Sequence, residues 1–181
     1  IKLKMANTED IVLLVASGEI DIGLIEGSVS SSAVTQQVIA SDELIVVSSD
    51  KTLVEEKYID SLINKKWILR EKGSGTRSVF LNQIKPVDLL LNIVIELEHT
   101  EAIKIFLLLD FTYISCLPRI SVLTELKEKN LFHLPISFRT PQKIRKIILR
   151  LHPLQGAGGL HPRLFQSHNH TCGVTGRKGQ P

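Results

Sequence analysis

Cysteines are scarce in this sequence: only Cys116 and Cys172 occur among 181 residues. Two cysteines so far apart exclude a disulfide framework and a CxxC metal knuckle. Cys116 lies within an apolar run and is predicted to be a reduced thiol in the core. We therefore expect a domain that folds without disulfide bonds.

Long apolar runs and targeting signals are also missing. No stretch approaches the roughly 18 apolar residues that span a bilayer. The opening residues "IKLKMANTED" show no secretory pattern of a basic start, an apolar stretch and a cleavage site. Together with the few cysteines, the missing signal favours the cytoplasm, and we expect no membrane partner.

Excess positive charge is missing from most of the chain, although the formal net charge is +3. Residues 152–181 contain Arg163, Arg177 and Lys178 and no acidic residue, so the rest of the chain is electrically balanced. A balanced body lacks the basic face that nucleic acid requires, and we expect no direct DNA contact by these residues. The tail, rich in glycine, histidine and proline, is predicted to be largely unstructured.

Motifs for catalysis are absent as well. The sequence has neither a G-x-S-x-G nucleophile elbow nor a G-x-x-x-x-G-K-[ST] nucleotide loop. In "HNHTC", His168, His170 and Cys172 alternate as metal ligands do, but no acidic residue of the tail supports them. We predict no enzyme activity, no cofactor and no resident metal.

Strand-like and helix-like segments alternate along the chain, which indicates an α/β architecture on a mostly parallel sheet. Thr8 and Thr100 are predicted to be helix N-caps. Ligands of such folds bind where strands end and helices begin. Strands are expected at 21–27, 42–49, 66–71, 89–98, 112–118 and 132–138, and helices at 8–17, 58–65, 75–84, 100–109 and 120–130.

One loop stands at such a place: "REKGSGTR", residues 70–77, follows a predicted strand and opens a predicted helix. Consecutive N–H groups in a glycine-containing turn form a concave site for an anion. Ser74 and Thr76 add hydroxyl donors, and Arg70 or Arg77 can bind a carboxylate with two hydrogen bonds. The alternative is a simple helix-capping turn.

Five segments together resemble the effector-binding domain of LysR-type transcriptional regulators over about residues 1–150. The resemblance implies a two-lobed, periplasmic-binding-protein-like (type 2) domain, in which two crossover strands join the lobes and a small inducer lies between them. In order, the segments are "GEIDIGLIEG" (18–27), "DELIVVSS" (42–49), "WILREKGSGTR" (67–77), "LEHTEAIK" (97–104) and "ISCLPR" (114–119).

Carried over, the resemblance implies lobe I from residues 1–46 and 117–150, lobe II from 47–116, and a tail from 151–181. It implies a homo-oligomer that senses a small anionic effector. DNA would be contacted only through a winged helix-turn-helix domain that is absent from this chain. The effector-binding residues would be Glu26, Gly27, Gly73, Ser74, Gly75, Thr76, Arg77 and Thr100.

Departures from the family pattern leave alternatives open. The first strand of lobe I and the closing helix of the family are not found in the sequence, which is typical of a truncated remnant without function. A solute-binding receptor of the same fold is another alternative and would require a signal peptide. An enzyme on this fold would require a catalytic group close to Ser74.

Overall fold

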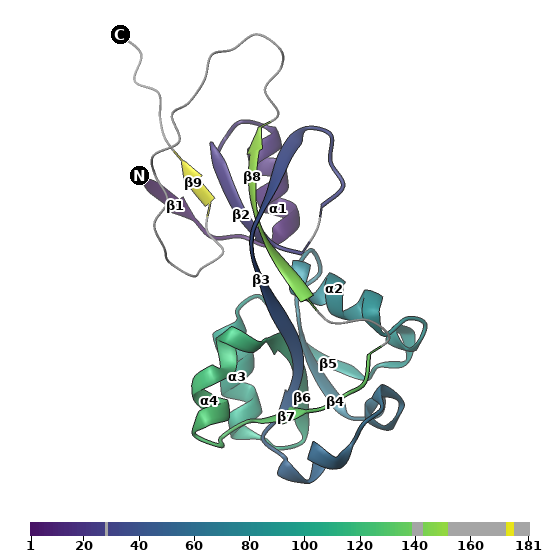
Figure 1. The fold of residues 1–181 in the computed structure, drawn as a ribbon. Helices are drawn as coiled ribbons and strands as arrows, with labels where there is room; N and C mark the ends of the chain where they lie inside the picture. The colour runs from purple at the N-terminus through teal and green to yellow at the C-terminus, as the bar shows by residue number, and fades with distance from the viewer. Residues whose placement is uncertain (28, 139–142, 152–172, 176–181) are drawn as a thin grey trace, which may run out of the picture.

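The computed structural model describes residues 1–27, 29–138, 143–151 and 173–175 as a mixed α/β structure with two halves stacked end to end (Figure 1). The strands are β1 (Lys2–Lys4), β2 (Ile22–Glu26), β3 (Val34–Ser48), β4 (Lys66–Arg70), β5 (Ile93–Leu97), β6 (Tyr113–Pro118), β7 (Phe132–Leu134), β8 (Lys143–Leu151) and β9 (Gly173–Thr175). The α-helices are α1 (Thr8–Ala16), α2 (Gly75–Gln83), α3 (Thr100–Leu109) and α4 (Leu123–Lys127), and short 3-10 helices cover Lys51–Glu55, Ile59–Leu62, Val87–Leu90 and Arg119–Val122.

A single long strand, β3, passes through both halves (Figure 1). Its first part, from Val34 to Glu43, pairs with β8, and its last part, from Leu44 to Ser48, pairs with β6. The sheet order is β1-β9-β2-β8-β3-β6-β4-β5, with β7 also on β3. Parallel pairing occurs where β4 meets β5 and β6, whereas the described pairs of β3 and β8 are antiparallel.

We call lobe I the half that contains α1, β1, β2, β8, β9 and the first part of β3. Asn7 is the N-cap of α1, since its side-chain oxygen accepts a hydrogen bond from the N–H of Asp10 over 2.9 Å. The predicted cap, Thr8, is instead the first helical residue. The apolar face of α1 packs on β2 and β8 in a core made of Ile11, Val15, Ile20, Ile25, Val34, Ile147 and Leu149.

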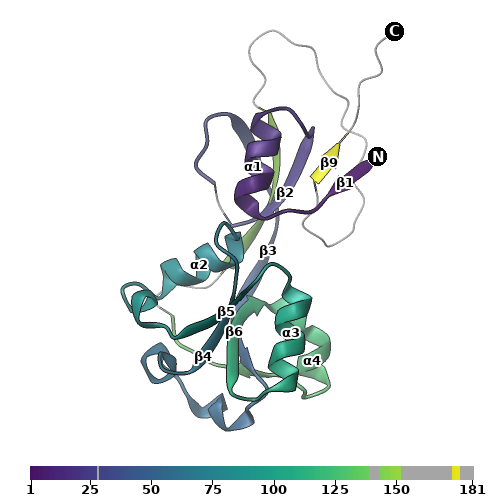
Figure 2. The same cartoon turned by 180° about the vertical axis from the view of Figure 1, so that it is seen from behind.

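Lobe II contains the remaining strands and helices, and α2 lies at the boundary with lobe I (Figure 2). Its sheet is buried on both faces, with separate apolar clusters around Trp67 and around Ile103. Trp67 is fully buried, as predicted for a core residue, and its Nε1–H donates to the carbonyl of Leu62 over 2.9 Å. The predicted core thiol, Cys116, is also buried, and burial raises the pKa of this thiol.

The packing bears on where one lobe ends and the other begins. Leu117, Val122 and Leu131 belong to the cluster around Ile103, and Leu134 belongs to the cluster around Trp67. This packing favours the assignment of residues 117–136 to lobe II, while β8 belongs to lobe I. The predicted boundaries, which place 117–150 in lobe I, stay a proposal.

Most of the tail lies outside the described residues. Of residues 151–181, the structure describes Leu151 at the end of β8 and β9 (Gly173–Thr175). The predictions of an unstructured tail and of no metal at His168, His170 and Cys172 fall on residues outside the described ones and stay untested. Within the described residues, no helix is long and apolar enough to cross a membrane.

Candidate functional site

The loop 71–74 connects β4 to α2 at the carboxyl end of a strand that is parallel to both of its neighbours. Gly73 has a φ of +89°, a left-handed conformation that glycine adopts without a steric penalty. The N–H of Ser74 donates to the carbonyl of Glu71 over 3.2 Å and closes the turn. Helix α2 then begins at Gly75, as the sequence predicts.

This turn makes direct hydrogen bonds to lobe I. The N–H of Gly75 donates to Thr8 Oγ1 over 3.2 Å, and the Thr8 hydroxyl in turn donates to the carbonyl of Glu26 over 3.2 Å. The N–H of Glu9 donates to the carbonyl of Gly73 over 3.3 Å. The first turn of α1, the end of β2 and the first residue of α2 therefore meet at one point.

Glycine at position 75 is required by this close approach. A Cβ added to Gly75 would lie 1.7 Å from the carbonyl oxygen of Glu26, which is far inside any real contact. Gly27, whose φ is +104°, faces Gly75 from lobe I, and its Cβ would lie 3.3 Å from the Gly75 Cα. Two glycines thus allow the two backbones to touch.

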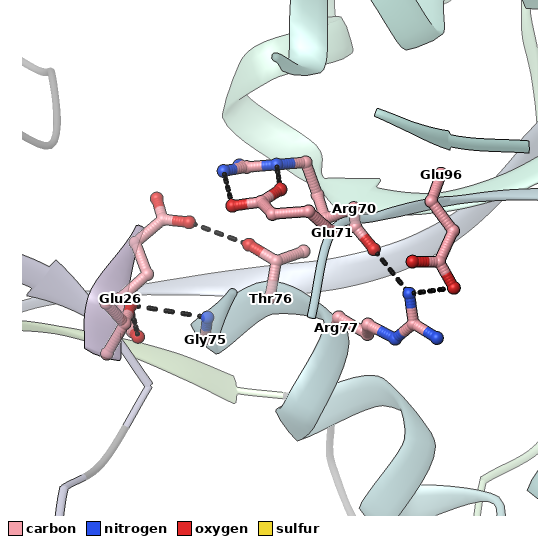
Figure 3. Close-up of polar contacts among 8 residues, drawn as sticks. Glu26, Arg70, Glu71, Gly75, Thr76, Arg77 and Glu96 are labelled. Atoms are coloured by element: carbon pink, nitrogen blue, oxygen red, sulfur yellow. Dashed lines mark hydrogen bonds and ion pairs between the residues drawn. The ribbon is translucent and has the colours of Figure 1, made fainter. Parts of the chain in front are cut away.

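A carboxylate and a hydroxyl also meet across the lobes. Thr76 Oγ1 donates to Glu26 Oε2 over 2.9 Å, which joins residues 50 positions apart in the chain (Figure 3). Thr76 is buried and Glu26 is half-buried. Among the ion pairs of the described residues, none involves Glu26. The hydroxyl predicted to bind an anion is therefore already bound to one, the carboxylate of Glu26.

Both arginines of the loop segment have acidic partners as well (Figure 3). Arg77 Nη1 lies 2.8 Å from Glu96 Oε1 and donates to the carbonyl of Arg70 over 2.9 Å. Arg70 binds Glu71 with two hydrogen bonds, of 2.8 and 3.1 Å. These contacts neutralise the two guanidinium groups that the sequence offers for an effector.

A cavity of about 460 Å³ lies between α1 and α2, next to the contact between the lobes. Its size falls in the usual range of small-molecule sites, roughly 300–1,000 Å³. Its wall mixes apolar side chains with hydroxyl and amide groups, and Glu9 is the only charged residue among the described residues that line it. The part of the wall nearest the loop consists of Thr8, Glu9, Gly73, Gly75 and Ser78.

The structure brings most of the predicted site residues to this boundary, though in different roles. Gly73 and Gly75 line the cavity, Gly27 lies against Gly75, and Thr76 binds Glu26. Ser74 is buried at the N-cap position of α2, where its side chain makes no capping hydrogen bond. Arg77 points to Glu96 instead of the cavity (Figure 3).

Thr100 differs from the prediction. It is the first residue of α3, and His99 rather than Thr100 occupies the N-cap position, without a side-chain capping bond. The N–H of Glu71 donates to the carbonyl of Leu97 over 3.2 Å, so the end of β5 lies beside the loop 71–74. Thr100 nevertheless does not line the described cavity.

Sequence reasoning missed the part that Thr8, Glu9 and Ser78 play. Thr8 was expected to cap a helix. Its hydroxyl instead accepts a hydrogen bond from Gly75, 67 positions later in the chain and in the other lobe, and donates one to Glu26. Its position at a helix start was visible in the sequence, whereas its long-range partner was not.

Comparison with known proteins gives relatives of one kind. A family model described as the LysR substrate binding domain matches residues 1–156. The HTH-type transcriptional regulator YeiE of Escherichia coli is 33% identical over 113 residues, which cover 58% of this chain and 36% of that protein. CysL of Bacillus subtilis, another HTH-type transcriptional regulator, is 34% identical over 76 residues, 40% of this chain and 25% of that protein. The matched segments thus span only about a third of YeiE and a quarter of CysL.

Solved structures share the fold. The regulatory domain of Synechocystis PCC6803 CcmR, solved in complex with 2-PG, is 26% identical with a TM-score of 0.72, over 85% of this chain and 74% of that one. The effector-binding domain of QuiR, solved with shikimate, has a TM-score of 0.68 at 18% identity, over 84% of this chain and 72% of that one, and shows the fold alone. The predicted two-lobed, periplasmic-binding-protein-like (type 2) α/β fold is confirmed.

Proposed function

The chain belongs to the family of LysR substrate binding domains, and from this premise we propose that it senses a small anionic metabolite between its two lobes for a bacterial transcriptional regulator. The effector would shift the population between lobe arrangements, and this shift would be passed on to the rest of the regulator. The proposal assigns no catalytic step to the chain, in keeping with its curated relatives, which are transcriptional regulators.

One observation carries the proposal: the loop 71–74 and the first turn of α2 form the contact between the lobes, beside a cavity of about 460 Å³. A ligand held there touches both lobes at once. Its binding energy can therefore favour one lobe arrangement over another, which is what a sensor requires.

The chemistry of the turn favours an anion. The first N–H groups of a helix have no partner within the helix, and the helix dipole is positive at this end. Ser74 and Thr76 bring hydroxyl groups to the same turn. The 2-PG complex of the CcmR regulatory domain supports the proposal that a small ligand binds a domain of this kind.

Thermal melts of the full chain with sulfate, phosphate, 2-PG and shikimate test the proposal, with an uncharged sugar as control. A ligand at a hundred times its Kd stabilises a domain by about 2.7 kcal/mol, which raises Tm by roughly 5–10 °C at this chain length. We expect one anion to produce such a rise, and Thr76→Val to abolish it. Thr35→Val, which removes an exposed hydroxyl on β3, should leave the rise intact. If no anion moves the Tm, the proposal is wrong.

We also propose that the chain forms a homo-oligomer through α3 and the turn that follows it. Large apolar side chains are exposed there, including Leu109 at 77% and Phe111 at 66% exposure. Contiguous exposed apolar surface is typical of protein interfaces. We expect Leu109→Lys to lower the sedimentation-derived mass of a dimer to that of a monomer, whereas Leu89→Lys, at an equally exposed site on lobe II, should not.

Contact with DNA is proposed for the whole regulator only, through a winged helix-turn-helix domain outside these 181 residues. We place that regulator in the cytoplasm, where promoters and metabolites are found together. A fusion of this chain to such a domain, tested for effector-dependent promoter binding, would check both proposals, and promoter binding that ignores every effector would contradict them.

A further inference from the structure

The carboxylate of Glu26 stands at the position where the proposed function places an anionic effector group. Its Oε2 accepts the hydrogen bond from Thr76 Oγ1 over 2.9 Å, and Thr76 is only 2% exposed. A buried hydroxyl of this kind donates one hydrogen bond. While Glu26 accepts that bond, an effector oxygen cannot.

Backbone contacts fix the place of Glu26 beside Thr76. The backbone carbonyl of Glu26 accepts the hydroxyl of Thr8, which in turn accepts the N–H of Gly75, the residue before Thr76. The side chain therefore starts from a fixed point directly opposite the first turn of α2. A short reach brings its carboxylate to the Thr76 hydroxyl (Figure 3).

Charge around the contact adds to the competition. The neighbouring charged groups are Arg70 with Glu71 and Arg77 with Glu96, and in each pair the cation is neutralised by its own carboxylate. Glu26 takes part in no ion pair of the described residues, although Lys146 lies opposite it on β8. An incoming anion at the Thr76 hydroxyl would meet the carboxylate of Glu26 at close range, where like charges repel.

We propose that Glu26 is an internal competitor that occupies the anion site of this domain in the absence of effector. This inference rests on the proposed function, since it concerns the same loop. The competitor holds the lobes together through Thr76 and weakens the affinity for the effector, because an anion binds only when the carboxylate moves away. Glu26 thus sets the concentration at which the domain responds.

Calorimetric titration of the full chain with sodium sulfate, and in parallel with phosphate, tests this inference. The decisive variant is Glu26→Gln, which keeps an oxygen acceptor for Thr76 and removes the charge. Glu19→Gln is the matched control, because it removes an exposed carboxylate of lobe I that does not line the cavity and does not touch the Thr76 hydroxyl. Thr76→Val in the Glu26→Gln background checks that binding occurs at this hydroxyl.

We expect Glu26→Gln to lower the Kd for at least one of the two anions about tenfold or more, Glu19→Gln to change it less than twofold, and Thr76→Val to reverse the gain. Equal affinity in the wild-type chain and Glu26→Gln would refute the competitor and leave the proposed function standing. Weaker binding by Glu26→Gln would make Glu26 a ligand of the effector and likewise overturn the inference. No binding to either variant at millimolar concentration would overturn both proposals.

Discussion

Substitution of Gly75 by alanine tests the contact between the lobes directly. Position 75 is the first residue of α2 and its φ is not in the left-handed region, so alanine fits the local backbone. The added Cβ, however, would lie 1.7 Å from the carbonyl oxygen of Glu26. Because that neighbour is backbone, it cannot rotate away, and we expect the lobes to separate at this point.

The magnitude follows from the hydrogen bonds that span the lobes. Three are lost when they part: Gly75 N–H to Thr8, Thr76 to Glu26, and Glu9 N–H to Gly73. At about 1 kcal/mol each, their loss destabilises the closed arrangement by about 3 kcal/mol relative to the open one. The ratio of closed to open molecules therefore falls roughly a hundredfold. Alanine in place of glycine in a helix returns up to about 1 kcal/mol. The net loss of about 2 kcal/mol is small beside a typical unfolding free energy of about 5–15 kcal/mol, so the variant remains folded.

Small-angle X-ray scattering of the wild-type chain and Gly75→Ala measures the separation, and urea denaturation measures the stability. We expect a larger radius of gyration with the unfolding free energy lowered by about 2 kcal/mol. Asn82→Ala provides the control, since it introduces alanine at an exposed position of the same helix. Unchanged scattering and stability in Gly75→Ala would refute the argument that glycine is required at this contact.

Three further predictions concern lobe II. Trp67→Phe removes a buried indole hydrogen bond, and we expect urea denaturation to give a free energy of unfolding lower by about 2–3 kcal/mol. Burial lowers the pKa of Lys104, but hydrogen bonds with Glu125 and Glu101 outweigh burial and raise this pKa above its ordinary value of 10.5. The stability that Lys104 contributes is therefore complete below pH 10.5 and lost as pH rises through the folded-state pKa; urea titrations should show this alkaline loss, and Lys104→Met should remove it. Burial raises the pKa of the Cys116 thiol, so peptide mapping should find Cys116 alkylated by iodoacetamide only after unfolding.

Local patterns in the sequence were sufficient for the elements that carry the loop. The apolar run of β4 and the Gly-Ser-Gly turn before α2 depend on residues close together in the chain, and both are found where they are expected. The caps were harder to place. Asn7 and Thr8 are both good capping residues. Asn7 accepts the capping hydrogen bond from Asp10, whereas the Thr8 hydroxyl accepts the N–H of Gly75 from the other lobe.

Long-range contacts could not be predicted in the same way. Arg77 is close in sequence to the proposed anion loop, but its partner Glu96 lies on β5 and becomes a neighbour only after the sheet has formed. The beginning of β3 was missed because most residues from Thr35 to Glu43 are exposed on this strand, so no apolar alternation marks it. Pairing with β8, more than a hundred residues later, makes this segment a strand.

The position of β8 in the sheet has a consequence for synthesis on the ribosome. β8 lies between β2 and β3 and supplies Ile147 and Leu149 to the core of lobe I. It leaves the ribosome about 100 residues after β3 begins, which takes roughly 5–20 s at ordinary rates of translation. Lobe II is largely contiguous in the chain and can fold during this interval. Until β8 is made, one edge of β2 stays unpaired and α1 lacks part of the core against which it packs. Nascent lobe I is therefore the half that a ribosome-associated chaperone would have to cover, although α1, β2 and the first part of β3 are made before lobe II.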